Sequence, residues 1–166
     1  VGYSSQKIII LNSSGNLINE TSLGVEINSV AVDDINQSNP WDEIVVSTDN
    51  GSIVILDSQL NILKSYQLSS SRLLDISVGE VTSEYEGLEI VAGGSDNKVY
   101  VLSPIGGLIG KFSTENWVQA TSIGDISEDP GNEIVVGTTM PSTYQLYVLN
   151  YEYFPTNLTV DIGNDG

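Results

Sequence analysis

The chain has 166 residues, of which 40% are hydrophobic, enough for one ordinary domain with a core. It has no cysteine and no histidine, which excludes disulfides and removes the commonest general base and the commonest zinc ligands. Five Lys and Arg against 22 Asp and Glu give a net charge of −17. This charge argues against nucleic acid and anionic membranes as partners, and it favours hard cations with oxygen ligands. The apolar runs are far too short to span a bilayer, so we expect no membrane insertion.

The predicted elements are short strands that return at a regular spacing. An apolar motif ends in leucine four times, in steps of 45, 46 and 47 residues, at Leu11, Leu56, Leu102 and Leu149. A second motif, Glu-Ile-Val, begins at Glu43, Glu89 and, in the third copy, Glu133. In chain order the predicted strands are 7–11, 28–34, 42–48, 52–56, 63–68, 74–80, 88–94, 98–102, 120–126, 132–138 and 145–150.

A period near 45 residues that contains several short strands is typical of a β-propeller blade. The runs 8–11, 43–46, 53–56 and 99–102 are almost continuously apolar, which predicts burial on both faces, as between stacked blades. Turn sequences rich in Gly, Asn and Asp separate the runs, and no helical periodicity is present. We therefore predict an all-β fold of propeller blades, each with four antiparallel strands.

The repeats predict an incomplete ring. The chain opens in the third strand of one blade and then contains two full repeats and most of another. About three blades cannot close a ring, because propellers use four to eight. We therefore expect residues 1–150 to be a segment of a larger propeller that needs the remaining blades or another chain. Residues 151–166 break the repeat and are interpreted as a linker or as the start of a following β domain.

Acidic loops precede the second strand of each repeat. Oxygen-bearing side chains at positions 1, 3 and 5 of a tight turn can converge on a cation, and Ca²⁺ takes six to eight oxygen ligands. The third loop offers such a set at Asp125, Ser127, Asp129 and Glu133. The first loop offers Asp34, Asn36, Ser38 and Asp42, and the second offers Glu80, Thr82, Glu84 and Glu89. The alternative is a turn whose carboxylates cap backbone N–H groups and face water.

The acidic turn followed by Glu-Ile-Val-Val-Gly and then by Gly-x-(Val/Ile)-x-(Val/Ile)-Leu resembles the FG-GAP or VCBS-type propeller repeat. Integrin α-subunit propellers and many secreted microbial proteins carry this repeat, and the similarity covers about residues 7–150. The resemblance implies a structural calcium ion in the loop between the first two strands of a blade. The third loop matches best and the first nearly as well, whereas the second departs most because Glu80 replaces the usual Asp.

No nucleophile–base pair can be built without Cys or His, so we expect no catalytic site in this segment. Trp41 and Trp117 are predicted to pack at blade edges, with sugar or partner contact as the alternative. The aromatic residues between 144 and 154 are predicted to pack against a following domain. Five Asn-x-Ser/Thr sequons are candidate N-glycosylation sites in a secreted protein, at Asn12, Asn19, Asn36, Asn50 and Asn157.

These observations favour a non-catalytic, calcium-stabilised propeller segment of an extracellular or cell-surface protein, with a protein or glycan as its ligand. Adhesion and cell-surface or filament assembly are the roles that fit this class. The alternative is the propeller domain of an extracellular polysaccharide-degrading enzyme, a lyase or hydrolase. A pyrroloquinoline-quinone-type propeller is disfavoured because that family's Trp docking motif is missing.

Overall fold

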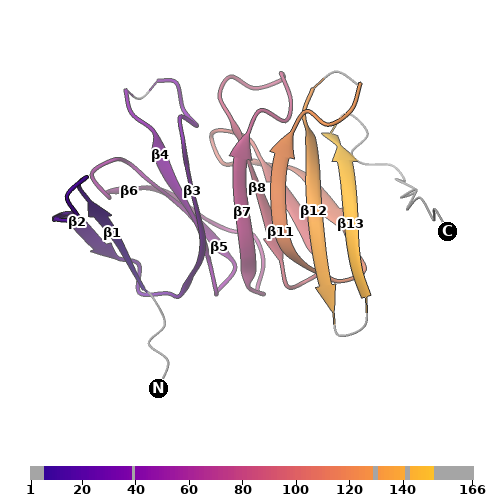
Figure 1. The fold of residues 1–166 in the computed structure, drawn as a ribbon, viewed down its shortest axis with the longest axis horizontal. Coiled ribbons are helices and arrows are strands. Elements are labelled where there is room, and N and C mark those ends of the chain that lie inside the picture. Colours follow the sequence, from indigo (N-terminus) through magenta and orange to yellow (C-terminus); the bar gives the residue numbers. More distant parts are fainter. Residues whose placement is uncertain (1–5, 39, 129–130, 141–142, 152–166) are drawn as a thin grey trace.

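The computed structural model describes residues 6–38, 40–128, 131–140 and 143–151. Within them, thirteen strands form four antiparallel sheets that follow one another along the chain and lie side by side (Figure 1). The strands are β1 Lys7–Leu11, β2 Leu17–Ser22, β3 Ile27–Asp33, β4 Glu43–Thr48, β5 Ser52–Leu56, β6 Ile62–Gln67, β7 Leu73–Gly79, β8 Glu89–Gly94, β9 Lys98–Leu102, β10 Leu108–Ser113, β11 Trp117–Gly124, β12 Glu133–Met140 and β13 Thr143–Asn150.

Each sheet is one blade of the predicted repeat. Strands β3 to β6 and β7 to β10 form two complete four-stranded meanders, and the first strand of each lies next to the neighbouring blade. A two-stranded sheet, β1–β2, precedes them, and a three-stranded sheet, β11–β12–β13, follows them. This confirms the prediction that the chain opens in the third strand of one blade and then contains two full repeats and most of another. The described array is an open, partial propeller.

Three apolar layers hold successive blades together. In the first, Ile8 and Ile10 of β1 pack against a cluster that includes Val46 and Leu56. The second lies between the two complete blades, and the third joins β8 and β9 to β11, β12 and β13. Every residue of β4 and β8 is buried, as the continuous apolar runs predict for strands covered on both faces.

The two ends of the array expose residues that the inner blades bury. Leu11 is 55% exposed, whereas Leu56 and Leu102, which occupy its position in the next two repeats, are fully buried. At the other end Leu146 is 62% exposed, although Val99 in the same place of the preceding blade is fully buried. The prediction that residues 8–11 are covered on both faces is therefore wrong for the described array. Only one face of β1 meets another blade.

One carboxylate joins the innermost strands of three blades. Asp75 on β7 accepts a hydrogen bond from the Ser29 hydroxyl on β3 at 2.8 Å. Its other oxygen accepts the Thr121 backbone N–H of β11 at 2.7 Å and the Thr121 hydroxyl at 3.2 Å. A β-bulge between Leu73 and Asp75 locally changes the direction of the strand, which is a common means of re-aiming a side chain. Asp75 therefore fixes the relative positions of neighbouring blades.

Among the described residues, no helix is long and apolar enough to cross a membrane. Tyr147 is buried with its ring edge against Phe112, and Tyr151 packs on the same cluster, whereas Tyr144 is exposed. The rest of the predicted aromatic group, and the predicted linker or domain start at residues 152–166, lie outside the described residues.

Candidate functional site

The acidic loops after β3, β7 and β11 lie along the same rim of the array, at the top of Figure 1. None of the five basic residues of the chain falls in these loops. The loops carry eight acidic residues between them, at Asp34, Asp42, Glu80, Glu84, Glu86, Asp125, Glu128 and Asp129. This rim of the array therefore has a strongly negative potential, which favours cationic or uncharged ligands over anionic ones.

A buried glutamate at the start of the second strand holds each loop. Glu43 accepts the backbone N–H groups of Ile35 and Asn36, both at 3.1 Å. Glu89 accepts those of Val81 at 2.8 Å and Thr82 at 3.2 Å. The loop backbone is thus closed by a side chain of its own blade, which is the capping arrangement that the sequence leaves open as an alternative to metal binding.

Glu133 repeats this arrangement with one difference. It accepts the Ile126 N–H at 3.0 Å, and its second oxygen accepts the Ser127 hydroxyl at 2.6 Å. The Ser127 hydrogen bond, followed by that of Ile126, lowers the pKa of Glu133. At Glu89, by contrast, burial raises the pKa, and the nearby Glu80 charge adds to the effect. The second oxygen of Glu89 is buried without a hydrogen-bond partner.

The predicted calcium ligands are only partly brought together. Among the described residues, no group of three or more acidic side chains converges in a way that could hold a metal ion. Asp125 and Asp42 are exposed, and Asp129 lies outside the described residues. In the first loop the Asn36 side chain accepts the Ser38 N–H at 3.2 Å, and in the second the Thr82 hydroxyl accepts the Glu84 N–H at 3.3 Å. Calcium binding stays a prediction.

Three hollows accompany the loops, two of them between neighbouring blades and one within a blade. The hollow between the complete blades is small, about 50 Å³, and includes Ile35 and Pro104. A larger cleft of about 390 Å³ separates the second and third loops. It is lined by polar side chains, chiefly Glu80, Thr82, Asp125 and Asn132, and Asn132 donates to the Glu80 carbonyl at 2.8 Å.

The third hollow, of about 280 Å³, lies within the blade of β3 to β6 and contains Trp41, the more exposed of the two tryptophans. It is lined by Pro40, Trp41, Glu43, Asp57, Ser58, Gln59 and Leu63. Trp41 is 70% exposed, so the prediction that it packs at a blade edge does not hold within the described array. Trp117 on β11 is 44% exposed and is only partly packed. Alignment of the repeats could have identified Trp41 from the sequence, because its position is occupied by glycine in the other two loops, at Gly87 and Gly131.

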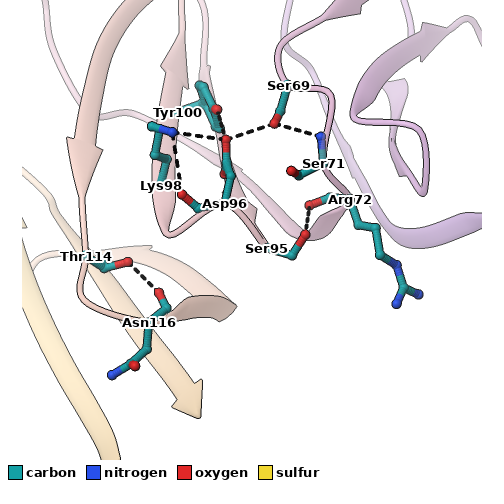
Figure 2. A network of polar contacts seen from close by, with 9 residues as sticks. All are labelled: Ser69, Ser71, Arg72, Ser95, Asp96, Lys98, Tyr100, Thr114 and Asn116. Atoms are coloured by element: carbon teal, nitrogen blue, oxygen red, sulfur yellow. Dashed lines mark hydrogen bonds and ion pairs between the residues drawn. The ribbon is translucent and has the colours of Figure 1, made fainter.

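A second polar cluster lies between the turn joining β8 and β9 and the segment joining β6 and β7 (Figure 2). One oxygen of Asp96 accepts hydrogen bonds from the Tyr100 hydroxyl at 2.5 Å and the Ser69 hydroxyl at 2.8 Å, and Lys98 lies 3.4 Å away. Burial, followed by the Asp96 hydrogen bond, raises the pKa of Tyr100 to about 12. The other oxygen of Asp96 is buried without a hydrogen-bond partner among the described residues. Because Ser69 lies in the segment that joins the two complete blades, the cluster ties this segment to the second blade.

The sequons occupy turns, loops and a strand. Asn12 accepts the N–H groups of Ser14 and Asn16, and Asn50 accepts the Thr48 hydroxyl. Asn36 and Asn50 are exposed. The amide nitrogen of Asn19 donates to the Gln59 carbonyl at 2.6 Å, an interaction that a glycan on this nitrogen would disturb. Asn157 lies outside the described residues.

Comparison with protein-family models finds a match between residues 4–144 and the lambda-carrageenase β-propeller domain. The chain belongs to this family. The propeller architecture implied by the sequence resemblance is thus confirmed, whereas membership of the FG-GAP or VCBS repeat is not. No curated protein sequence matches the chain.

Solved structures similar to this carrageenase-family segment are also propeller-like, at low identity. The BBS1N chain from its complex with ARL6DN shares 17% identity over 89% of this chain and 45% of its own, with a TM-score of 0.64. Sqt1 of Saccharomyces cerevisiae shares 11% over 81% and 36%, with a TM-score of 0.61. Sqt1 of Chaetomium thermophilum, solved with the N-terminus of ribosomal protein L10, shares 17% over 78% and 34%, with a TM-score of 0.59. The chain therefore spans less than half of each, and the likeness concerns the fold.

Proposed function

We propose that this segment belongs to the propeller domain of an extracellular polysaccharide-processing protein, in which it supports and positions the polysaccharide-binding parts instead of performing the bond cleavage. The observation that carries the proposal is the family match over residues 4–144, because the family is named after an enzyme that degrades carrageenan. This reading corresponds to the enzyme-domain alternative from the sequence. The exposed sequons at Asn36 and Asn50 suit an extracellular location.

The supporting role follows from the chemistry of the described residues. Carrageenans are sulfated and therefore anionic, so a loop face without basic residues repels such a chain. The buried glutamates of this face bind the backbone of their own loops. Asp75, the carboxylate at the inner strands, is engaged by Ser29 and Thr121. These contacts maintain the geometry of the blades, so they support a structural role for the buried glutamates and for Asp75.

The test is depolymerisation of λ-carrageenan by the full-length protein, followed through the release of reducing ends. We expect activity in the wild type and equal activity in Glu80→Ala and Asp125→Ala, which remove the exposed acids of the cleft of about 390 Å³. Loss of activity in either variant, with unchanged thermal stability, would place catalysis in this segment. A full-length protein that cleaves no carrageenan would refute the polysaccharide-processing proposal.

Protein binding is the second candidate, and it retains the adhesion or assembly role considered from the sequence. It is supported by similar structures that were solved as complexes, BBS1N with ARL6DN and Sqt1 with the N-terminus of ribosomal protein L10. A partner of this segment would carry basic groups, given the net charge of −17. Salt-sensitive retention of the full-length protein on a basic peptide resin, lost when Glu84 and Glu86 are replaced by Gln, would favour this candidate.

A further inference from the structure

The turn that joins β9 and β10 exposes an isoleucine at its tip. Ile105 is 67% exposed. Polar residues, Ser14 and Gln59, occupy the same place in the corresponding turns of the two preceding sheets. A single exposed apolar side chain is ordinary, but Ile105 departs from its own repeat and lies beside other exposed apolar residues. This combination is typical of a contact surface.

The incomplete ring does not account for this exposure. Ile105 belongs to the blade of β7 to β10, which has a described sheet on each side. Gln59, its counterpart on the preceding blade, is exposed although the blade that follows it is complete. Further blades at either end of the array would therefore leave the tip of this turn uncovered.

Ile105 and Leu63 border a small apolar hollow between the two complete blades. The hollow has a volume of about 50 Å³, and its apolar lining residues are Ile35, Ile55, Leu63, Pro104 and Ile105. Ile35 and Ile55 are buried, whereas Leu63 is 45% exposed. We call this hollow the Leu63–Ile105 notch. Its volume suits the end of one aliphatic side chain.

The wall of the notch on the β9–β10 turn is held rigidly. The Ile105 carbonyl accepts hydrogen bonds from the Lys64 side chain at 2.9 Å and from the Tyr66 hydroxyl. Gly106, with φ of +85°, lies so close to Tyr66 that a Cβ would come within 2.1 Å of its ring. The backbone of the turn is thus fixed to the neighbouring blade while the Ile105 side chain is exposed. A side chain held in this way loses little conformational entropy when a partner binds.

A β-bulge shapes the opposite wall, on β6. Leu63 is the extra residue at the register shift, between Ile62 and Lys64. Because a bulge interrupts the regular alternation of side chains, Ile62 and Leu63 are both exposed although they are consecutive. The bulge therefore adds a second apolar side chain at this edge of the notch.

The second acidic loop lies next to the notch. Gly87, at the end of this loop, approaches Pro104 so closely that a Cβ there would come within 3.0 Å of the Pro104 Cβ. Glu84 and Glu86 precede Gly87 in the same loop and are exposed. Among the described lining residues, Lys64 alone is basic, and its ammonium group binds the Ile105 carbonyl. On this acidic rim, a partner with basic residues is favoured over an acidic one.

We propose that the Leu63–Ile105 notch binds an aliphatic side chain from a basic segment of a partner protein. Leu63 and Ile105 contact this side chain, and the acidic loop attracts the basic residues that flank it. An apolar centre with a polar rim is the usual arrangement of a protein interface. This inference rests on protein binding, the second candidate function, and it is independent of the polysaccharide proposal.

The first test measures whether the notch is accessible in the full-length protein. Ile105→Cys and Gln59→Cys introduce thiols at equivalent turn tips, and background labelling is measured on the wild type. A maleimide should label the two native variants at similar rates. Slow labelling of native Ile105→Cys alone, with rapid labelling after denaturation, would show that another part of the protein covers the notch, and the proposal would be overturned.

The second test is fluorescence anisotropy of the full-length protein with two labelled peptides of equal charge, in which Lys alternates with Leu or with Ser. The Leu peptide should bind at least about tenfold more tightly, because it buries an aliphatic side chain in the notch. Ile105→Ser should abolish this preference without lowering the melting temperature, since the side chain is exposed. The matched control is Leu17→Ser, which should keep the preference. Leu17 is 60% exposed at the start of β2, the repeat position of Ile62 on β6.

Equal affinity of the two peptides for the wild type, or an unchanged preference in Ile105→Ser, would refute the notch. Protein binding through the acidic loop would survive that result if replacing Glu84 and Glu86 by Gln releases both peptides. If neither peptide binds, the notch and protein binding both fail. A preference that requires Ile105 but is insensitive to Glu84 and Glu86 would overturn the assignment to a basic segment. The expected preference in a protein that cleaves no λ-carrageenan would refute the polysaccharide proposal alone.

Discussion

At the scale of single residues, the most consequential side chain is Asp75, because it links three inner strands through both of its oxygens. Asp75→Ala leaves the Ser29 hydroxyl and the Thr121 N–H without their acceptor. Hydrogen bonds to charged groups contribute about 1.5–3 kcal/mol, so we expect the free energy of unfolding to fall by about 2–3 kcal/mol. Urea denaturation measures this change.

A matched control for Asp75 is Glu20→Ala, which also removes one negative charge. Glu20 forms an exposed ion pair with Lys7 at 2.8 Å, and such pairs contribute about 0–1 kcal/mol. Equal losses in the two variants would show that Asp75 acts only through its charge, and the interblade role would then be wrong.

The buried glutamates predict opposite dependences of stability on pH. The pKa of Glu89 is raised by burial, so the folded state binds its proton more tightly, and its contribution to stability falls as pH rises from about 4.5 through the folded pKa. The pKa of Glu133 is lowered by Ser127, so its contribution is present above about 4.5 and is lost as pH falls through the folded pKa.

Melting temperatures of wild type, Glu89→Gln and Glu133→Gln between pH 3 and 7 test this difference. Relative to wild type, Glu89→Gln should gain stability as the pH rises. Glu133→Gln should lose stability over the same range, because the wild type gains the stabilisation of the charged carboxylate and the variant cannot. Parallel curves for the two variants would contradict the assignment.

At the scale of strands and turns, Gly51 lies between β4 and β5 with φ of +84°, and a Cβ there would come within 2.2 Å of the Ser69 carbonyl oxygen and 2.4 Å of that of Ser71. Gly15, in the turn after β1, has a similar φ of +79° and open space around it. Gly15→Ala should therefore lower the free energy of unfolding only by the cost of the left-handed backbone conformation, about 1–2 kcal/mol. Gly51→Ala should lower it clearly more, and chemical denaturation measures both changes. Equal costs would show that the segment 69–71 moves aside without penalty.

The calcium prediction also belongs to the scale of loops. If the acidic loops bind Ca²⁺ with the affinity of extracellular modules, the melting temperature of the full-length protein should rise and saturate at about 10⁻⁴–10⁻³ M Ca²⁺. Asp125→Ala, which removes a ligand of the third loop, should reduce the rise, and Glu20→Ala should not. No difference between calcium and chelator would mean that the loops are organised without calcium, by contacts such as the glutamate caps.

The sequence predicts the strands well because apolar runs and their period depend on local patterns, and β4, β5, β8 and β9 lie where these patterns place them. It leaves open the role of Glu133, since a carboxylate before an apolar strand is equally typical of a metal ligand and of a cap. The structure shows the cap through the Ile126 N–H, whereas the metal stays a prediction. The hollow beside Trp41 is harder to predict, because it forms only when the loop after β3 meets the turn at Asp57 in the folded blade.

At the scale of the whole molecule, the outer faces of the first and last sheets expose residues whose counterparts form the contacts between the inner blades. Leu11 is the counterpart of the buried Leu56, and Leu146 is the counterpart of the buried Val99. Exposed apolar faces of this kind associate with other surfaces, and an open sheet edge adds unpaired backbone groups. Closure by further blades or by another chain would cover both, and propellers typically contain four to eight blades.

We therefore expect Leu146 to be covered in the full-length protein. The segment has no cysteine, so Leu146→Cys introduces a single thiol here, and background labelling is measured on the wild type. A maleimide should label this thiol slowly in the native protein and rapidly after denaturation. Ser70→Cys, at an exposed position between β6 and β7, should react rapidly in both states. Rapid labelling of Leu146→Cys in the native protein would mean that the last face stays open, so that the exposed strand β13 would itself be a docking surface for another chain.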